Sequence, residues 1–269
     1  MLKVPQAWDC YEDALWEYEG IGWYSTKLHP DDFIVGKRIE LIFNRVMYYS
    51  KVWLNGEYIG ENIGGYLPFS FDITKYLKVG QENSLVVRVD NKPRIEWLPA
   101  AEQIEWIQYG GLLEPVELVS SSHIYIEDFT IVTIPEKDKA QINCIASIVN
   151  ETDASDEMEL GVLLSRGTHI INKKVKFKCK PNKSTKISVD LTVDHADLWS
   201  PDNPALYKAV ASITKENIPI DDFTDRFGIR QMRVDGTYLK LPGPPVIIKG
   251  AHRYDAYDRF GPNPPEKLV

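Results

Sequence analysis

Histidine and cysteine, the residues most often used for metal binding and nucleophilic catalysis, are scarce in this chain and widely separated. The five histidines show no metal-ligand spacing and form no Ser/His/Asp or Cys/His pattern. They are His29, His123, His169, His195 and His252. Cys144 and Cys179 alternate with polar neighbours, so we expect both to face a core, and with Cys10 they form no Cys-x-x-Cys pair. The sequence therefore predicts no metal site and no cofactor.

Aromatic side chains offer a different chemistry. They form 11% of the chain, with seven Trp and fourteen Tyr. Trp97 and Trp106 lie in a long loop, Pro93 to Gly111, where they could form a stacking platform for a ring-shaped ligand. Packing in a core is the commoner fate of such residues, and we expect it for at least one of the two.

The charge of the chain argues against a nucleic-acid partner. The formal net charge is -8 and the pI is about 5.3, so a phosphate backbone would be repelled. The densest basic run, Lys173 to Lys180, alternates lysine with Val175, Phe177 and Cys179, which is typical of a strand with one solvent-exposed face.

No run approaches the ~18 apolar residues of a membrane span, and we expect no membrane partner. The first residues lack secretory-signal features, but a signal that had been removed would leave no trace. The sequence therefore does not distinguish a cytoplasmic protein from one that is periplasmic or secreted after removal of a signal.

Period-2 alternation of apolar and polar residues runs through the chain and predicts an all-β protein. The clearest run is Ile187, Val189, Leu191 and Val193, with polar residues between them. Only 9–19 could form a short helix. Asn55-Gly56 and Asp235-Gly236 each separate two short strands, as in tight hairpin turns that need positive φ. Short strands with such turns favour β-sandwiches.

Short motifs follow one another in a defined order along the chain. The first part carries Gly22-Trp23-Tyr24, Val52-Trp53-Leu54-Asn55-Gly56, Gly64-Gly65-Tyr66-Leu67-Pro68-Phe69, Val89-Asp90-Asn91 and Tyr109-Gly110-Gly111-Leu112. The second part carries Leu198-Trp199-Ser200-Pro201-Asp202-Asn203-Pro204, then Phe227-Gly228-Ile229-Arg230, then Ile248-Lys249-Gly250 and Arg253-Tyr254-Asp255. Each motif alone is weak, but in this order, across nearly the whole chain, they resemble glycoside hydrolase family 2, the β-galactosidase and β-glucuronidase group.

The resemblance implies a jelly-roll β-sandwich followed by an immunoglobulin-like β-sandwich. We expect a sugar-binding jelly-roll domain at residues 1–122 and an immunoglobulin-like domain at 123–234. Residues 235–269 would be a linker and the start of a catalytic TIM barrel, with its first strand at Val246-Ile247-Ile248. The chain would end before the rest of that barrel.

The resemblance also implies that no catalytic residue is present. Retaining glycosidases use two carboxyl groups about 5 Å apart, and the two glutamates of the family lie on barrel strands beyond residue 269. Asn150-Glu151 matches the dipeptide that carries the acid/base of the family, but Thr152-Asp153 follows it. We interpret Glu151 as part of a turn and expect the chain alone to be inactive.

The substrate-binding residues implied by the resemblance lie in two segments. An acidic residue six positions before the second Gly of the Tyr-Gly-Gly segment contacts sugar hydroxyls in the family. That position is Glu105, where the family usually has Asp, and a solvated loop carboxylate is an equally weighted alternative. Trp106 lies beside it. Arg253, Tyr254 and Asp255 follow the expected barrel strand and would line the pocket; the family also shows Arg-His-Glu there, and it usually has Arg where this chain has Glu114.

These observations predict the N-terminal portion of a retaining β-glycosidase, with β-galactosidase favoured over β-glucuronidase and β-mannosidase. Its partners would be a β-galactoside or β-glucuronide and the missing barrel domain, with a homo-oligomer as an open alternative. A stand-alone carbohydrate-binding protein is the first rival interpretation. A structural or adhesive pair of sandwiches is the second.

Overall fold

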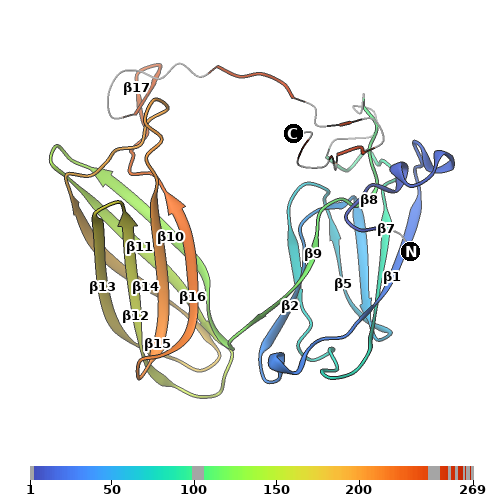
Figure 1. The fold of residues 1–269 in the computed structure, drawn as a ribbon, viewed down its shortest axis with the longest axis horizontal. Coiled ribbons are helices and arrows are strands. Elements are labelled where there is room, and N and C mark those ends of the chain that lie inside the picture. The colour runs from blue at the N-terminus through green and yellow to red at the C-terminus, as the bar shows by residue number, and fades with distance from the viewer. Residues whose placement is uncertain are drawn as a thin grey trace. The chain divides into compact units, whose positions relative to one another are not determined.

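The structure of the protein is a computed structural model that describes residues 3–98, 106–241, 249–253, 256–257, 260–262, 264 and 267. Contacts divide the chain into two compact units (Figure 1). Unit 1 comprises Met1–Ser120 and His252–Val269, and unit 2 comprises Ser121–Ala251. Within the described part of the chain, no helical segment reaches the length and hydrophobicity that a membrane crossing requires.

Strands dominate both units, as the alternation predicts. The helical segments described are three short 3-10 turns: η1 (Trp8–Cys10), η2 (Asp13–Leu15) and η3 (Asp32–Ile34). The strands of unit 1 are β1 (Ile21–Leu28), β2 (Arg38–Phe43), β3 (Val46–Met47), β4 (Tyr49–Leu54), β5 (Glu57–Ile63), β6 (Phe69–Asp72), β7 (Asn83–Asp90), β8 (Gly111–Leu112) and β9 (Val116–Ser121). The strands of unit 2 are β10 (Ile124–Pro135), β11 (Lys139–Asn150), β12 (Asp156–Arg166), β13 (His169–Cys179), β14 (Lys183–Asp194), β15 (Tyr207–Lys215), β16 (Ile218–Phe227), β17 (Arg233–Asp235) and β18 (Tyr238–Lys240).

Unit 1 is a sandwich of a four-stranded sheet, β1-β7-β4-β5, and a three-stranded sheet, β6-β2-β9. The short pair β3-β8 lies beside them. Alternate side chains of each sheet enter a shared apolar core in which Phe43, Val52, Leu54, Ile73 and Val89 are completely buried. The predicted hairpin is present between β4 and β5, with φ of 55° at Asn55 and 85° at Gly56.

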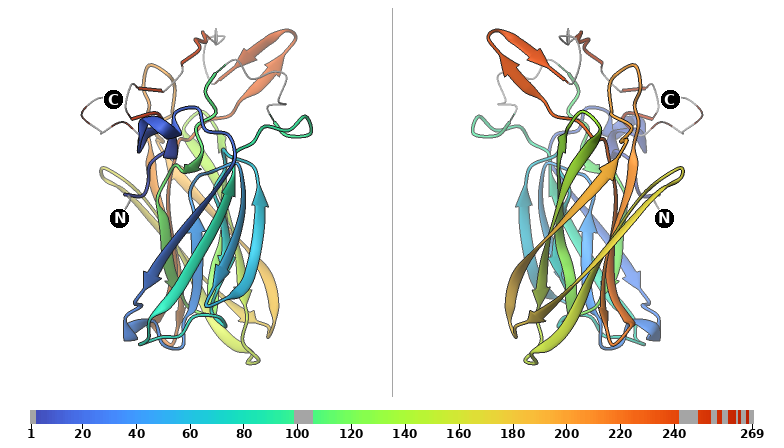
Figure 2. Two further views of the ribbon diagram at one scale, coloured as in Figure 1. Left: turned by 90° about the vertical axis from the view of Figure 1, so that its right-hand side faces the viewer. Right: turned by 90° about the vertical axis from the view of Figure 1, so that its left-hand side faces the viewer.

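Unit 2 is a sandwich of seven strands in two sheets, β10-β11-β14 and β13-β12-β15-β16 (Figure 2, right view). This three-on-four arrangement of antiparallel strands is that of immunoglobulin-like domains. Cys144 and Cys179 are completely buried in it, as the alternation predicts. Together the two sandwiches confirm the predicted all-β fold class. The expected barrel strand at 246–248 lies outside the described residues.

Two motifs of the second part, Leu198 to Pro204 and Phe227 to Arg230, meet in space. The backbone N–H of Trp199 donates to the carbonyl of Ile229 over 3.0 Å, and the guanidinium of Arg230 lies 4.4 Å from the centre of the Trp199 ring. The Ser200 and Asn203 backbones are hydrogen-bonded to each other in both directions, and the prolines at 201 and 204 fix φ there, so the segment forms a tight turn. Asn203 therefore has a structural role.

Candidate functional site

The register of unit 1 brings several loops to one end of its four-stranded sheet. Tyr49, at the start of β4, is opposite both Ile63, at the end of β5, and Asp90, at the end of β7. Asp90 is also opposite Ile21, where β1 begins. The segments that precede β1 and follow β5 and β7 therefore leave the sheet together. We call this region the loop end of unit 1.

The N-terminal segment pairs with the Tyr-Gly-Gly segment at this loop end. Gln6 N–H donates to the Leu112 carbonyl and Trp8 N–H to the Gly110 carbonyl, each over 3.0 Å. A Cβ on Gly110 would lie 2.3 Å from the Trp8 ring, so this close approach requires glycine. Gly111 has φ of +113°, which also favours glycine. Both glycines of the Tyr-Gly-Gly segment therefore occupy positions where a Cβ would be blocked or strained.

Asn91 ties three segments of the loop end together. Its side chain is completely buried. The amide nitrogen donates to the carbonyls of Tyr18 over 3.0 Å and Gln108 over 3.1 Å, and the amide oxygen accepts from Gly20 N–H over 2.8 Å. This anchoring fixes the base of the loop that carries residues 105 and 106. Nothing in the sequence around Asn91 predicts this role, because the three groups that it binds lie 17 to 73 residues away.

The two loop tryptophans have different environments. Trp97 is 6% exposed, and its ring stacks on Tyr48 with centres 4.5 Å apart, while the Arg94 guanidinium lies 4.7 Å from its centre. Trp97 is therefore a packing residue, the fate expected for at least one of the pair. Trp106 is 44% exposed. Its indole keeps a solvent-facing surface that a ligand can contact.

The predicted site residues are only partly described. Glu105, Tyr254 and Asp255 lie outside the described residues, and Arg253 is an exposed residue of unit 1. The segment that follows Arg253 returns to the loop end of unit 1. A Cβ on Gly261 would lie 2.9 Å from the Tyr109 ring and 3.1 Å from Cys10 Sγ. Tyr109 is three residues from Trp106, so two segments far apart in sequence pack against each other here.

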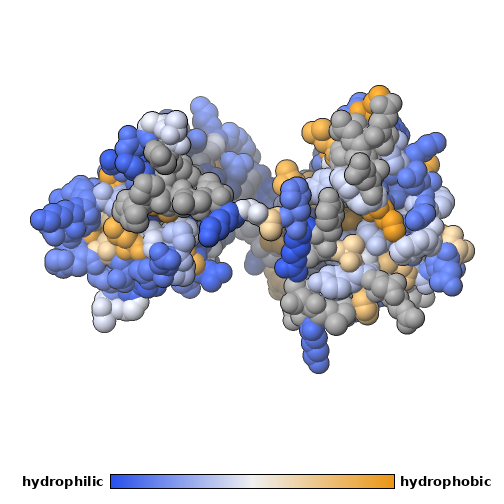
Figure 3. All heavy atoms as spheres, turned by 90° about the horizontal axis from the view of Figure 1, so that it is seen from above, coloured by the Kyte–Doolittle hydropathy of each residue, from blue (hydrophilic) through white to orange (hydrophobic). Residues whose placement is uncertain are grey.

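Apolar side chains also gather on the surface of the loop end. Four of them are between about half and four-fifths exposed: Tyr66 at 49%, Leu67 at 77%, Ile95 at 66% and Leu98 at 79%. Figure 3 shows orange surface in this unit between the hydrophilic side chains. An exposed apolar group of this kind marks a surface for interaction.

A buried carboxyl group lies under the same loops. Asp9 is 3% exposed, and its Oδ2 accepts a hydrogen bond from Gly110 N–H over 2.9 Å. Burial raises the pKa of the Asp9 carboxyl above its ordinary value. The folded state therefore favours the neutral form. The stability that this protonation contributes is present at low pH and is lost as the pH rises through the folded pKa.

We expect Asp9→Asn, which keeps an oxygen for Gly110 and has no charge, to become more stable relative to wild type as the pH rises from about 4 to about 8. Urea denaturation at both pH values measures the difference in the free energy of unfolding. Asp13→Asn is the control, because Asp13 is exposed in the same unit. If the difference in free energy of unfolding between Asp9→Asn and wild type did not change with pH, or changed as it does for Asp13→Asn, burial of the Asp9 charge would not be destabilising.

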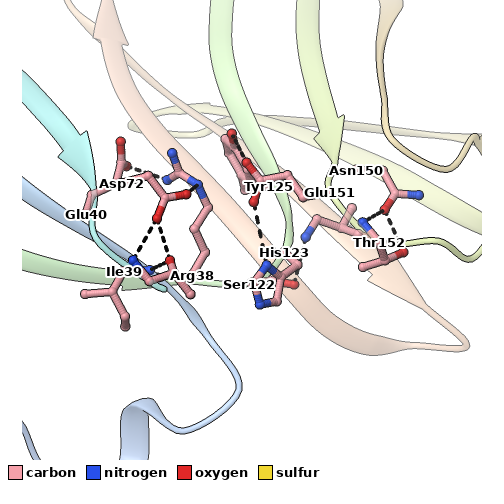
Figure 4. Close-up of polar contacts among 12 residues, drawn as sticks. Arg38, Ile39, Glu40, Asp72, Ser122, His123, Tyr125, Asn150, Glu151 and Thr152 are labelled. Carbon is pink, nitrogen blue, oxygen red and sulfur yellow. Dashed lines mark hydrogen bonds and ion pairs between the residues drawn. The ribbon is translucent and has the colours of Figure 1, made fainter. Parts of the chain in front are cut away.

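The Asn150-Glu151 pair lies at the end of β11 in unit 2 and forms a turn (Figure 4). Asn150 Oδ1 accepts from Thr152 N–H over 2.8 Å and from Thr152 Oγ1 over 2.7 Å. Glu151 Oε1 accepts from the Tyr125 hydroxyl over 3.2 Å, and Oε2 lies 3.6 Å from His123 Nδ1. These contacts give Asn150 a turn-forming role, as the following Thr-Asp pair predicts. Among the described residues, no three His, Cys, Asp or Glu side chains are grouped as metal ligands.

Comparison with known proteins identifies the family. Residues 7–121 match the model of the glycosyl hydrolases family 2 sugar binding domain, and residues 124–230 match a second model of glycosyl hydrolases family 2. The chain belongs to this family.

The relatives of the chain are longer proteins. A β-galactosidase of Thermoanaerobacter pseudethanolicus is 30% identical over 94% of the chain and 34% of its own length. A β-glucuronidase of Bacteroides fragilis is 28% identical over 93% of the chain and 37% of its own length. The chain thus spans about a third of the length of these curated relatives.

Solved structures agree with the fold. A Bacteroides uniformis β-glucuronidase 2, covalently bound to cyclophellitol-6-carboxylate aziridine, matches 99% of the chain with a TM-score of 0.88 and 25% identity. The chain covers 33% of that protein. A Ruminococcus gnavus β-glucuronidase matches 99% of the chain with a TM-score of 0.83 and 23% identity, which supports the fold alone.

Proposed function

We propose that this chain is the sugar-binding and immunoglobulin-like portion of a retaining family 2 β-glycosidase, most similar in activity to a β-galactosidase. In this proposal the jelly-roll domain comprises residues 1–122 and the immunoglobulin-like domain residues 123–234. The hydrolytic carboxyl pair is supplied by a barrel domain, and this chain shapes one edge of the substrate pocket. The substrate is a β-galactoside or, as the second choice, a β-glucuronide.

The pocket edge is assigned from one observation, the packing of Gly261, which follows Arg253, against Tyr109, which follows Trp106. The contact of Gly261 with Tyr109 places these two segments in the same unit. Glu105 would accept hydrogen bonds from sugar hydroxyls, Trp106 would stack on the ring, and Arg253, Tyr254 and Asp255 would line the other side. The exposed apolar side chains of the loop end support the proposal, because a neighbouring domain would cover them.

Hydrolysis by the chain itself is the first test. We expect none with p-nitrophenyl β-galactoside or p-nitrophenyl β-glucuronide, because the proposal places both carboxyl groups elsewhere. The rival interpretation, a stand-alone carbohydrate-binding protein, also predicts no hydrolysis. A rate that rose with the concentration of contaminant-free chain would contradict both.

A chimera tests the pocket edge. The chain would replace the matching third of the Bacteroides fragilis β-glucuronidase, and kcat and KM would be measured with both nitrophenyl glycosides. We expect Glu105→Gln to lower kcat/KM by about tenfold or more, since a hydrogen bond to a charged group contributes about 1.5–3 kcal/mol. Trp16→Ala is the control, because Trp16 is a half-exposed residue of the same unit. Equal effects of the two substitutions would contradict the role of Glu105.

A further inference from the structure

The outer face of the four-stranded sheet of unit 1 carries a row of exposed aromatic rings. Val52 and Leu54 of β4 point into the core and are completely buried, so Trp53 between them points outward. Its ring centre lies 5.6 Å from that of Trp23 and 5.7 Å from that of Tyr58. We call these three residues the outer aromatic strip. The left view of Figure 2 looks toward the strands that carry it.

Regular strands hold the strip in place. Trp23 lies on β1, Trp53 on β4 and Tyr58 on β5, and β7 runs between the first two. On β7, Val86 is opposite Trp53 and Arg88 is opposite Trp23, so the two indoles lie diagonally across that strand. Trp23 is 62% exposed and Tyr58 48% exposed. Because strands rather than loops position these rings, little conformational entropy is lost when a ligand contacts them.

A hydrogen-bonded cluster borders the strip. Glu61 Oε2 accepts from the hydroxyls of Tyr49 over 2.8 Å and Tyr58 over 3.0 Å, and it lies 3.3 Å from Lys51 Nζ. Hydrogen bonding, first from Tyr49, lowers the pKa of the Glu61 carboxyl, which is therefore charged at neutral pH. Its charge is balanced by the adjacent lysine. The cluster offers polar atoms to a ligand without a net charge.

A second charged group borders this face. The Arg88 guanidinium lies 3.2 Å from Asp90 Oδ2 and 5.8 Å from the centre of the Tyr49 ring. Arg94 lies 3.5 Å from the same carboxylate oxygen and 4.7 Å from the centre of the Trp97 ring, so the group keeps one positive charge. Both guanidinium groups are already engaged with Asp90 and with an aromatic ring, so stacking on the strip, rather than a new ion pair, is what this face offers a ligand.

The size of the strip argues against a second copy of the chain as the occupant. Trp23 is 62% exposed and Tyr58 48% exposed, while Trp53 is partly buried, so three aromatic side chains of about 150–250 Å² each offer at most about 400 Å². A stable dimer needs about 800 Å² from each partner. A sugar ring fits better, since it has an apolar face of C–H groups for an aromatic ring and hydroxyls around its edge for the polar cluster.

We propose that the outer aromatic strip of Trp23, Trp53 and Tyr58 binds an uncharged, extended oligosaccharide. The chain would then hold a polysaccharide in addition to shaping a substrate pocket. This inference does not depend on the proposed glycosidase activity, because it rests on residues of the sheet alone.

Nuclear magnetic resonance of the whole chain tests the proposal. The probes are cellohexaose, xylohexaose and β-1,4-galactohexaose, each titrated to about 10 mM, which detects dissociation constants in the millimolar range. We expect at least one of them to shift the indole N–H signals of Trp23 and Trp53. We also expect Trp23→Ala to weaken that binding by about tenfold, measured by calorimetry.

Two matched controls accompany this test. Trp16→Ala removes a half-exposed indole of the same unit that lies outside the strip, and Tyr58→Phe keeps the ring while removing the hydroxyl. We expect the first to leave affinity unchanged and the second to weaken it less than Tyr58→Ala. Absence of binding by all three hexasaccharides, or equal binding by Trp23→Ala, would overturn the proposal. Concentration-dependent self-association that Trp23→Ala abolishes would overturn it in favour of a second copy.

Discussion

Replacing Asn91 by alanine is expected to lower the free energy of unfolding of unit 1 by about 3–5 kcal/mol. The side chain is completely buried and serves three backbone groups, the carbonyls of Tyr18 and Gln108 and the N–H of Gly20. Alanine leaves all three groups without this partner; the Gln108 carbonyl is in a buried contact, and, among the described residues, the Tyr18 carbonyl keeps only the Trp8 indole N–H as a donor, over 3.3 Å. An unsatisfied buried polar group costs about 1–3 kcal/mol.

Urea denaturation followed by tryptophan fluorescence measures this loss. Six of the seven tryptophans lie in unit 1, so the signal reports mainly on that unit. Asn62→Ala is the matched control, because Asn62 is a half-buried asparagine of unit 1 with one long hydrogen bond, of 3.3 Å, to Gly64. We expect the control to cost less than about 1 kcal/mol. Similar losses in the two variants would show that Asn91 does not anchor the loop end.

The second large effect is expected from Trp97→Ala. We expect this substitution to lower the free energy of unfolding of unit 1 by about 3–5 kcal/mol, the range found for truncating a buried aromatic residue. Trp97 is 6% exposed and packs with Tyr48, Met47 and Leu113 in a small apolar cluster. Its removal leaves the Tyr48 ring without its stacking partner and opens a cavity under the loop that leads to residues 105 and 106.

The same denaturation measurement checks this prediction against two variants. Trp97→Phe keeps an aromatic ring on Tyr48. Its free energy of unfolding is expected to fall by less than half the decrease seen for Trp97→Ala. Trp16→Ala removes an indole that is 48% exposed and is expected to have a small effect. A Trp97→Ala variant as stable as Trp16→Ala would mean that the loop does not depend on this stack.

The strands, the turns and the fold class could be predicted from the local pattern of residues in the sequence. Asn55-Gly56 predicts a hairpin because positive φ is costly for most other residues, and both residues adopt it. Alternation places Cys144 and Cys179 in a core, where both are buried. Such features depend on neighbours a few positions apart, so a single sequence contains the information needed to predict them.

The candidate site depends on contacts between distant segments. The sequence gives no basis for distinguishing Trp97 from Trp106. In the folded chain, Trp97 stacks on Tyr48, whereas Trp106 is 44% exposed. The anchoring of Gly20, Tyr18 and Gln108 by Asn91 joins positions 17 to 73 residues apart.

The outer aromatic strip is a further result of tertiary structure. Trp23, Trp53 and Tyr58 come together only because β1, β7, β4 and β5 pair in that order and register. By itself, the sequence determined the kinds of elements and the family to which their order belongs. Which side chains meet was decided by long-range pairing and close packing, because one-residue changes of register reverse the face on which a side chain lies.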